Sequence, residues 1–366
     1  MVVGFSLFTE KQPRSSQHVA SRPFGSIQKK NTKELASYWR TAIKALQLCG
    51  QEKQTDISWH CTHLHEDGFQ GKHMNESHDI TRFSSINKGP HLLVLGSIHG
   101  NEICGKIAIQ RAIELFRRGK WKLKAGTVTF LPVANPLAHK RDIRFVDVNL
   151  NRVIKEHKNP KRYEEFLANT IVRLIKECDW LLDIHSFHTR GAPAVFRDFN
   201  DKRTKAFCQC FEVECIITGW IQMYEALGKK NVNAGDTVSF AHQHKKPGVV
   251  IECGQHSDPK NTKVALTAIE NALAHLNLIE GTSKRRKPAK KQGAVRGYKI
   301  VLKQKEGELT KIWKNLDKIR AGEVIAVYKD GSCERAPRDG HIILPKPWAK
   351  TGEEWFYFGV PELSKP

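Results

Sequence analysis

The sequence has no long hydrophobic run and no evident secretory signal. Its longest apolar stretches are about six residues, whereas a helix that crosses a bilayer needs roughly 20. The first residues lack the basic segment and the sustained apolar run of a signal peptide. These absences predict a cytoplasmic protein that does not insert into a membrane.

The cysteines also lack the regular spacing that a disulfide framework would show. The chain has nine cysteines, an odd number, and they are scattered without regular intervals. Free thiols of this kind are typical of a reducing compartment, which agrees with a cytoplasmic location.

Acidic residues are scarce. The 366 residues include 60 Lys and Arg but only 38 Asp and Glu, which gives a formal net charge of +22. Such a charge attracts either a polyanion or small acidic substrates. The basic residues are spread along the chain without interleaved aromatic side chains. The composition therefore favours a small acidic substrate over a nucleic acid.

What the sequence does contain is a regular change of hydrophobic period after residue 90. Strand-like apolar runs occur at 91–97, 127–133, 180–184, 213–217 and 248–252, and most of the segments between them have the i, i+3, i+4 spacing of helices. Strands that alternate with helices predict a mostly parallel sheet covered by helices on both faces. The predicted fold class is therefore α/β, an α/β/α sandwich.

Breaks in this pattern divide the chain into four segments. Residues 1–73 are weakly patterned and form an extension of unknown role. Met74 is therefore a candidate for the true start of the protein. Residues 74–281 form the α/β domain. Residues 282–293 hold six positive charges and are typical of an exposed linker. The short β-type runs in 294–366 predict a small β-sandwich or barrel.

Two features of the extension carry expectations of their own. An amphipathic pattern over 32–50 predicts a packing helix. Further along, four histidines and a cysteine lie close together, but their spacing matches no tetrahedral zinc pattern, so we expect a polar loop there. These residues are His60, Cys61, His63, His65 and His73.

Polar side chains follow the first apolar run in the motif GSIHGNE. His99 and Glu102 are three residues apart, so both can face one point across a turn. Imidazole and carboxylate suit Zn²⁺, and a catalytic zinc takes three protein ligands and a water. His185, which follows the run 180–184, supplies the third ligand. Asp183 lies on the same face of that strand, where it can orient the site.

A carboxylate also ends the last apolar run, in the motif VIECG. Placing Glu252 there costs free energy unless the side chain serves a purpose. The role that fits is a general base, which takes a proton from the attacking water and returns it to the leaving amine. We therefore predict Glu252 as the catalytic carboxylate.

The segment 135–152 follows another strand and so belongs to the same edge of the sheet. It offers the guanidinium groups of Arg144 and Arg152 and the amide of Asn151. One guanidinium can stabilise the oxyanion that forms when water attacks a carbonyl, and another can hold a substrate carboxylate with two hydrogen bonds.

Together these motifs resemble a known family. GSIHGNE, the NP that precedes R…D.N.LNR, DIHS and VIECG are similar to the motifs of the succinylglutamate desuccinylase/aspartoacylase family, which belongs to the zinc carboxypeptidase-like hydrolases. The resemblance covers roughly residues 90–280 and keeps the order of the motifs. It implies a zinc carboxypeptidase-like sandwich followed by a small β domain.

The resemblance also implies a role for each site residue. One zinc per chain would be held by His99, Glu102 and His185, and Glu252 would be the catalytic glutamate. Arg144 would polarise the scissile carbonyl. Asn151 and Arg152 would bind a substrate carboxylate.

The chain departs from the family at one position. Members that cleave N-acetylaspartate carry an arginine ten residues before the catalytic glutamate, where this chain has His242. Arg190, which follows the third predicted ligand, is a candidate replacement for that charge. The resemblance therefore does not imply that this chain acts on N-acetylaspartate or N-succinylglutamate.

The sequence thus predicts a zinc-dependent amidohydrolase that deacylates an N-acyl amino acid or a similar small acidic amide. A carboxypeptidase-like peptidase stays open as an alternative with the same chemistry. A catalytically silent, basic nucleic-acid-binding protein stays open as an alternative without it. The sequence is also compatible with a homo-oligomer.

Overall fold

The computed structural model describes residues 59–66, 78–228, 235–280 and 292–362. The expected helix at 32–50, the residues His73 and Met74, and most of the linker lie outside these ranges. Among the residues described, no helix has both the length and the apolar character needed to cross a bilayer.

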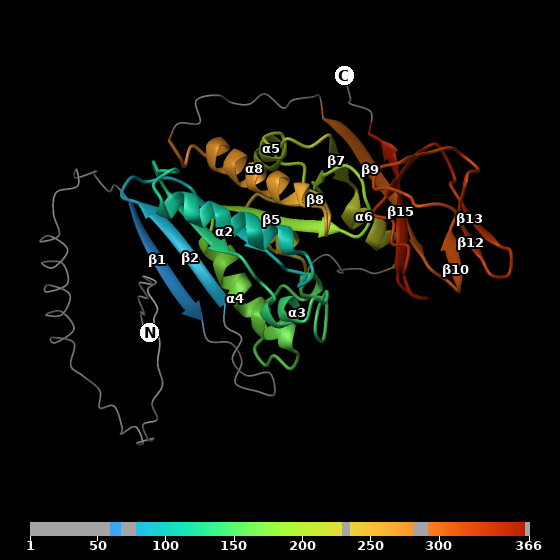
Figure 1. The fold of residues 1–366 in the computed structure, drawn as a ribbon, viewed down its shortest axis with the longest axis horizontal. Helices are drawn as coiled ribbons and strands as arrows, with labels where there is room; N and C mark the ends of the chain where they lie inside the picture. The colour runs from blue at the N-terminus through green and yellow to red at the C-terminus, as the bar shows by residue number, and fades with distance from the viewer. Residues whose placement is uncertain (1–58, 67–77, 229–234, 281–291, 363–366) are drawn as a thin grey trace, which may run out of the picture. The chain divides into compact units, whose positions relative to one another are not determined.

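A mixed sheet runs through the described chain (Figure 1). Its strand order is β1-β2-β4-β3-β5-β8-β6-β7-β9-β15-β14-β11. The central strands β4, β3, β5 and β8 are parallel to one another, as the alternation of strands and helices predicts. The bounds of the strands up to β8 are β1 Trp59–Glu66, β2 His78–Ser85, β3 His91–Gly96, β4 Thr127–Leu131, β5 Trp180–Phe187, β6 Ala194–Phe196, β7 Cys215–Thr218 and β8 Gly248–Gln255.

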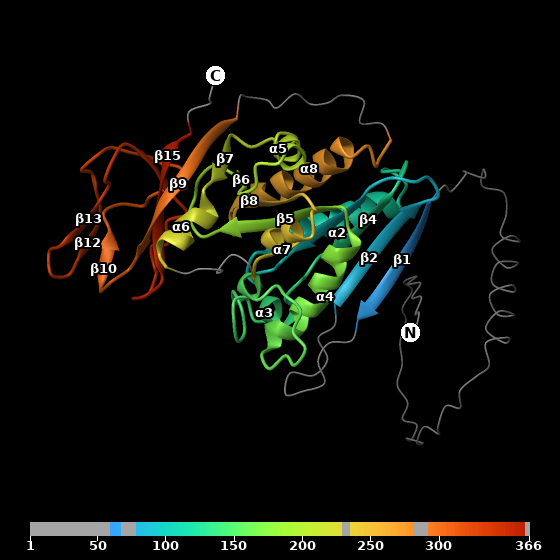
Figure 2. The same cartoon turned by 180° about the vertical axis from the view of Figure 1, so that it is seen from behind.

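Helices cover both faces of this sheet. On one face α2 (Ile103–Arg117) packs beside α8 (Lys260–His275), and α5 (Lys202–Cys208) joins the same core (Figure 1). The other face is turned toward the reader in Figure 2, where α4 (Tyr163–Glu177) packs against α7 (Thr237–Gln243). The shorter elements are α3 (Pro136–Lys140), η1 (Leu150–Arg152) and α6 (Trp220–Ala226). The predicted α/β/α sandwich is confirmed.

The alternation of side chains along β5 determines which face of the sheet carries the candidate site residues. Leu182 and Ile184 enter the core beneath α2 and α8, and Leu181 enters the core beneath α4 and α7. Successive side chains of a strand point to opposite faces. Asp183 and His185 therefore lie on the side of α4 and α7, at the carboxyl end of a central strand.

The sheet extends further toward the N-terminus than the expected boundary at residue 74. β1 pairs antiparallel with β2 along its whole length, from Trp59↔Ser85 to Glu66↔His78. The polar loop expected at 60–73 is therefore wrong for 60–66. This is an edge strand whose residues His60–His63 are exposed, so it lacks the apolar alternation that reveals a half-buried strand.

The C-terminal β region continues the same sheet. β9 (Gly293–Leu302) pairs in parallel with β7, and β15 (Glu354–Pro361), β14 (Gly340–Ile343) and β11 (Lys318–Ile319) follow in antiparallel order. A second sheet of β10 (Gly307–Leu309), β12 (Val324–Tyr328) and β13 (Cys333–Arg335) shares a core with it, built around Trp313 and Trp355. The short β-type runs expected in 294–366 correspond to β9, β12, β14 and β15, at 298–302, 323–328, 341–345 and 355–360 of the sequence.

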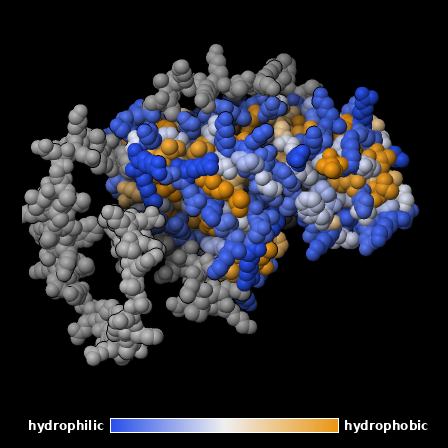
Figure 3. Space-filling model, viewed as in Figure 1, coloured by the Kyte–Doolittle hydropathy of each residue, from blue (hydrophilic) through white to orange (hydrophobic). Residues whose placement is uncertain are grey.

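Hydrophilic side chains are distributed over the visible face, with smaller hydrophobic patches between them (Figure 3). Three large apolar side chains in the described ranges are mostly exposed, namely Ile312 at 83%, Ile86 at 77% and Trp348 at 62%. Trp348 is the one of these that lies near the candidate site.

Candidate active site

The loop between β3 and α2 places the first two predicted ligands. Ser97, the residue directly after β3, has a φ of 48°, a left-handed conformation that costs a non-glycine residue about 1–2 kcal/mol. At Gly100 a Cβ would lie 2.2 Å from the carbonyl carbon of Ala138, so only glycine allows α3 to approach. Backbone strain and close packing thus fix His99 and Glu102, which immediately precedes α2.

The three predicted ligands converge. His99, Glu102 and His185 are buried, and one donor atom of each lies within 4.8 Å of the others. His99 Nδ1 lies 2.8 Å from Glu102 Oε1, and His185 Nδ1 lies 2.9 Å from Glu102 Oε2. Among the described residues this is the one group of three His, Cys, Asp or Glu side chains that could hold a metal.

The far side of each imidazole lies beside an oxygen. His99 Nε2 donates to Asn149 Oδ1 at 3.1 Å. An N–H directed at an outer oxygen in this way leaves Nδ1 with the lone pair that a metal requires. His185 Nε2 lies 3.0 Å from Asp183 Oδ2, within ion-pair distance, but has no hydrogen-bond partner among the described residues. Asp183 thus lies where the sequence predicts an orienting carboxylate.

The charges around these groups favour a cation. Burial lowers the pKa of His99 to about 4, with help from the charge of Arg144, so its imidazole is neutral. Burial opposes the charges of Glu102 and His185, but their partners outweigh it. The two imidazoles hold the pKa of Glu102 well below its usual range, and Asp183 and Glu102 raise the pKa of His185. A metal bound at His185 would therefore displace a proton from the imidazole. With that proton displaced, the two nitrogens and the buried carboxylate fit a zinc ion.

Glu252 lies directly beside the third ligand. It is the Cα partner of His185 in the parallel ladder of β5 and β8. Its Oε2 is buried and has no hydrogen-bond partner among the described residues. Burial, reinforced by the charge of Glu102, raises the pKa of Glu252 to about 8. A nearby divalent cation would lower this pKa and favour the carboxylate that a general base needs.

Arg144 joins the same group. Its Nη1 donates to Glu102 Oε1 at 2.9 Å, and 38% of its side chain is exposed. The loop that carries it is anchored by the buried Glu164 of α4, whose carboxylate accepts from the backbone N–H groups of residues 146–148. The sequence did not reveal Glu164, because an acidic residue in the first turn of a helix is an ordinary feature there.

Asn151 and Arg152 make no direct hydrogen bond to the candidate ligands among the residues that the structure describes, but are connected to them through other residues. Asn151 is buried, and its Oδ1 accepts from the backbone N–H of Thr237 at 3.1 Å. Thr237 in turn donates to Asp183 Oδ2 at 2.6 Å, which connects this pair to His185. Arg152 donates to the hydroxyl of Tyr224 at 3.3 Å.

Arg190 is exposed. In the described part of the chain, no hydrogen bond or ion pair links its side chain to the candidate ligands. Its backbone is held by the C-terminal β region, because Asn315 N donates to Arg190 O at 2.8 Å. The structure therefore brings together His99, Glu102, His185, Glu252 and Arg144, places Asn151 and Arg152 beside them, and leaves Arg190 at the surface.

Two further histidines, His188 and His256, lie near this group. The His188 ring lies 4.6 Å from the His256 ring and 5.7 Å from the Trp348 ring. His256 Nδ1 lies 2.7 Å from Ser186 Oγ, the residue after the third predicted ligand. The signal was present in the sequence, since His188 and His256 each follow a predicted site residue within four positions.

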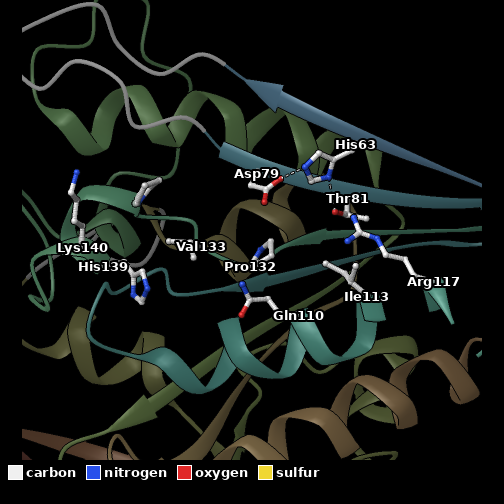
Figure 4. A pocket seen from close by; sticks show the side chains of 11 residues that line it. His63, Asp79, Thr81, Gln110, Ile113, Arg117, Pro132, Val133, His139 and Lys140 are labelled. Carbon is white, nitrogen blue, oxygen red and sulfur yellow. Dashed lines mark hydrogen bonds and ion pairs between the residues drawn. The ribbon is translucent and has the colours of Figure 1, made fainter. Parts of the chain in front are cut away.

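A separate cavity of about 660 Å³ lies between β1, β2, α2 and α3 (Figure 4). His63 forms an ion pair with Asp79 at 2.7 Å on one wall, and His139 and Lys140 lie at the other end. Its lining includes none of the candidate ligands.

Asp198 provides a test of electrostatics outside the candidate ligands. Burial raises its pKa from 3.8 to about 7, although its Oδ1 accepts from Trp220 N at 2.8 Å. A carboxyl whose pKa is higher in the folded state stabilises the fold below its unfolded pKa, and that stability is lost as pH rises through the folded pKa. The wild type should therefore lose stability between about pH 4 and pH 7 relative to Asp198→Asn, which keeps the acceptor but does not ionise.

Denaturant unfolding of both proteins at about pH 5 and pH 8 measures this gap, which should widen in favour of the variant at the higher pH. Asp339→Asn is the matched control, because Asp339 Oδ1 accepts from Ala321 N at the same 2.8 Å but is exposed. A constant gap for Asp198→Asn at the two pH values would contradict the expectation.

Comparison with known proteins agrees with the geometry. Residues 88–276 match the family described as the succinylglutamate desuccinylase/aspartoacylase catalytic domain. A probable aspartoacylase from Prochlorococcus marinus strain AS9601 is 28% identical over 127 residues, which are 32% of this chain and 40% of that protein. The chain thus spans less than half the length of the curated relatives it matches.

Solved structures show the same fold. A succinylglutamate desuccinylase/aspartoacylase from Rhodobacter sphaeroides is 18% identical with a TM-score of 0.65, and the match covers 85% of this chain and 98% of that one. The product-bound ectoine utilization protein EutE (DoeB) from Ruegeria pomeroyi is 19% identical with a TM-score of 0.67, covering 82% and 95%. The zinc carboxypeptidase-like architecture predicted from the sequence is confirmed.

Proposed function

Because the chain belongs to the succinylglutamate desuccinylase/aspartoacylase family of hydrolases, we propose that it is a zinc-dependent amidohydrolase that removes the acyl group from a small N-acyl amino acid. One observation supports this most directly. Two imidazole Nδ1 atoms and a buried carboxylate converge on one point, and Glu252, whose buried Oε2 has no hydrogen-bond partner among the described residues, is paired in register with His185.

His99, Glu102 and His185 would hold the zinc. The donor set fits it, because two nitrogens and one carboxylate leave a fourth position for water or substrate. When bound, zinc supplies a Lewis acid that polarises the carbonyl and makes water acidic enough to attack near neutral pH. Asn149 and Asp183 keep the imidazoles in the orientation that binding requires.

The chain's own residues then divide the reaction between them. Glu252 takes a proton from the attacking water and delivers it to the nitrogen of the leaving amine, so the amide C–N bond breaks without releasing an unprotonated amide anion. The guanidinium of Arg144 stabilises the negative charge that develops on the carbonyl oxygen. Asn151 and Arg152 bind a carboxylate of the substrate. Arg190 remains a candidate for a second contact from the surface.

We assign the catalytic domain to residues 74–281, to which β1 adds an edge strand from the extension at 1–73. The linker is 282–293, and the small β region at 294–366 continues the sheet of the catalytic domain through β9. The unpaired cysteine pattern supports a cytoplasmic location. A homo-oligomer remains compatible with this organisation.

The proposal is tested by amine release from a panel of N-acyl amino acids. We expect the purified chain to hydrolyse at least one of them, to lose that activity after treatment with a chelator and to recover it with zinc. C-terminal hydrolysis of blocked dipeptides in the same assay would instead support the peptidase. Zinc-loaded protein that hydrolyses nothing but binds DNA with a steep salt dependence would support the nucleic-acid-binding alternative.

A further inference from the structure

The cavity beside α2 has polar side chains where a core would have apolar ones. Phe83 of β2 stacks on Phe116 of α2, with ring centroids 4.8 Å apart. Because side chains alternate between the two faces of a strand, Asp79 and Thr81 lie on the same side of the sheet as Phe83. Both line the cavity of about 660 Å³. The apolar packing beneath α2 therefore ends at Phe83, and a polar recess begins beside it.

One face of α2 forms a long wall of this cavity (Figure 4). Gln110, Ile113 and Arg117 line it at positions i, i+3 and i+7, which lie on one side of a helix. From the rise of an α-helix, the Cα atoms of Gln110 and Arg117 are about 10 Å apart along its axis. Ile113 faces Pro132 and Val133 across the middle of the cavity. The cavity thus has an apolar middle with a guanidinium at one end.

Arg117 extends from α2 toward the edge strands β1 and β2 (Figure 4). Burial raises the pKa of the Cys61 thiol on β1, and a hydrogen bond from Arg117 opposes this shift. A guanidinium has several N–H donors, so this contact leaves donors for a ligand. Asp79 is the one acidic side chain among the described residues that line the cavity, and its Oδ1 pairs with His63 Nε2 at 2.7 Å. Arg117 therefore gives this end of the cavity a positive charge that an anion can use.

A second cation lies at the opposite end of the cavity. Lys140, the last residue of α3, lines that end and is exposed, so it can meet a ligand that enters from solvent (Figure 4). His139 beside it donates from Nδ1 to Gly100 O at 2.9 Å and accepts from Lys106 Nζ at 2.8 Å. Both ring nitrogens of His139 are thus engaged, and the ring is a fixed part of the wall. Lys106 adds a positive charge behind it.

An apolar middle between two cationic ends fits a particular class of compound. The volume lies within the usual range for small-molecule sites, roughly 300–1,000 Å³. An arginine can hold a carboxylate with two hydrogen bonds, and a lysine attracts one as a point charge. Methylene groups between two carboxylates would be buried against Ile113 and Val133. The net charge of +22 on the chain also raises the local concentration of small anions.

We propose that this cavity is a binding site for a linear aliphatic dicarboxylate, separate from the candidate active site. One carboxylate binds Arg117 and the other binds Lys140, while the aliphatic chain crosses Ile113 with the amide of Gln110 beside it. Because none of the candidate metal ligands lines the cavity, a compound bound there is not placed for hydrolysis. The inference does not depend on the proposed function.

The test is calorimetric binding of suberate and octanoate to the full chain. These compounds have equally long carbon chains and differ in one terminal carboxylate. We expect suberate to bind about tenfold more tightly, because octanoate lacks one hydrogen-bonded charge contact. Arg117→Gln and Lys140→Gln should each weaken suberate binding by about tenfold. Arg118→Gln makes the same charge change at the next residue of the chain, but Arg118 pairs with Glu114 and does not line the cavity, so suberate binding should be unchanged.

Equal affinities for suberate and octanoate in the wild type would overturn the inference, as would unchanged suberate binding in Arg117→Gln and Lys140→Gln. Suberate binding that is lost in Arg144→Gln but kept in Arg117→Gln would place the compound at the candidate active site and refute the inference as well. If one of the two cavity variants does not fold, the other makes the same test. A chain that hydrolyses nothing but binds suberate through Arg117 and Lys140 would still support the inference, so its failure is distinct from that of the proposed function.

Discussion

We expect Glu252→Gln to bind one zinc per chain and to lose about 10²- to 10⁴-fold in kcat, because general-base catalysis contributes that much to a rate. The substitution keeps the size and the planar shape of the side chain but removes the proton acceptor. Glu252 is not among the three converging ligands, so metal binding should survive. It also removes a buried carboxylate without a hydrogen-bond partner for Oε2, so the fold should not be weakened.

Single-turnover rates and metal analysis on the same preparation check this expectation. Glu280→Gln serves as the control, because Glu280 is exposed at the end of the domain and the charge change is identical. Activity near the wild-type level in Glu252→Gln would remove this residue from the role of base. A loss of zinc together with activity would instead make Glu252 a ligand.

The second large effect is expected from Glu102→Gln. The carboxylate of Glu102 meets both imidazoles, Arg144 and the backbone N–H of Ser186. Its removal leaves buried charges without their partner, and breaking a buried ion pair in this way costs about 3–5 kcal/mol. We therefore expect a lower melting temperature, zinc content well below one per chain and no measurable hydrolysis.

Glu114→Gln on the same helix is the matched control, since Glu114 is 55% exposed and forms an ion pair with Arg118 one turn further along the chain. That variant should keep zinc, stability and activity. Circular dichroism at low temperature shows whether Glu102→Gln is folded when its metal is measured. A folded Glu102→Gln protein with a full complement of zinc would show that the carboxylate is not a ligand.

The architecture of the central domain follows from periodicity. The apolar runs at 91–97, 127–133, 180–184, 213–217 and 248–252 became β3, β4, β5, β7 and β8, because buried parallel strands are apolar on both faces. Three strands were missed: β1 lies at the edge of the sheet, β2 lies between β1 and β4, and β6 is only three residues long. Backbone pairing, rather than an apolar pattern, defines them.

The candidate ligands could be predicted because each lies at the carboxyl end of a buried strand or within a few residues after it. Glu164, Glu354 and Tyr357 could not, because their contacts join residues far apart in the chain. Glu354 reaches Tyr224 across 130 positions, and Tyr357 reaches it across 133. No local spacing records such a contact, so the surroundings of Tyr224, which binds Arg152, emerge only from the folded chain.

The parallel pairing of β9 with β7 joins the C-terminal β region to the catalytic domain in one hydrogen-bonded ladder, although a linker separates them in the sequence. Heat or denaturant should therefore unfold both regions in a single cooperative transition. A chain truncated within the linker would lack β9 and leave β7 with unpaired backbone groups along an open edge, where unwanted strand pairing and aggregation begin.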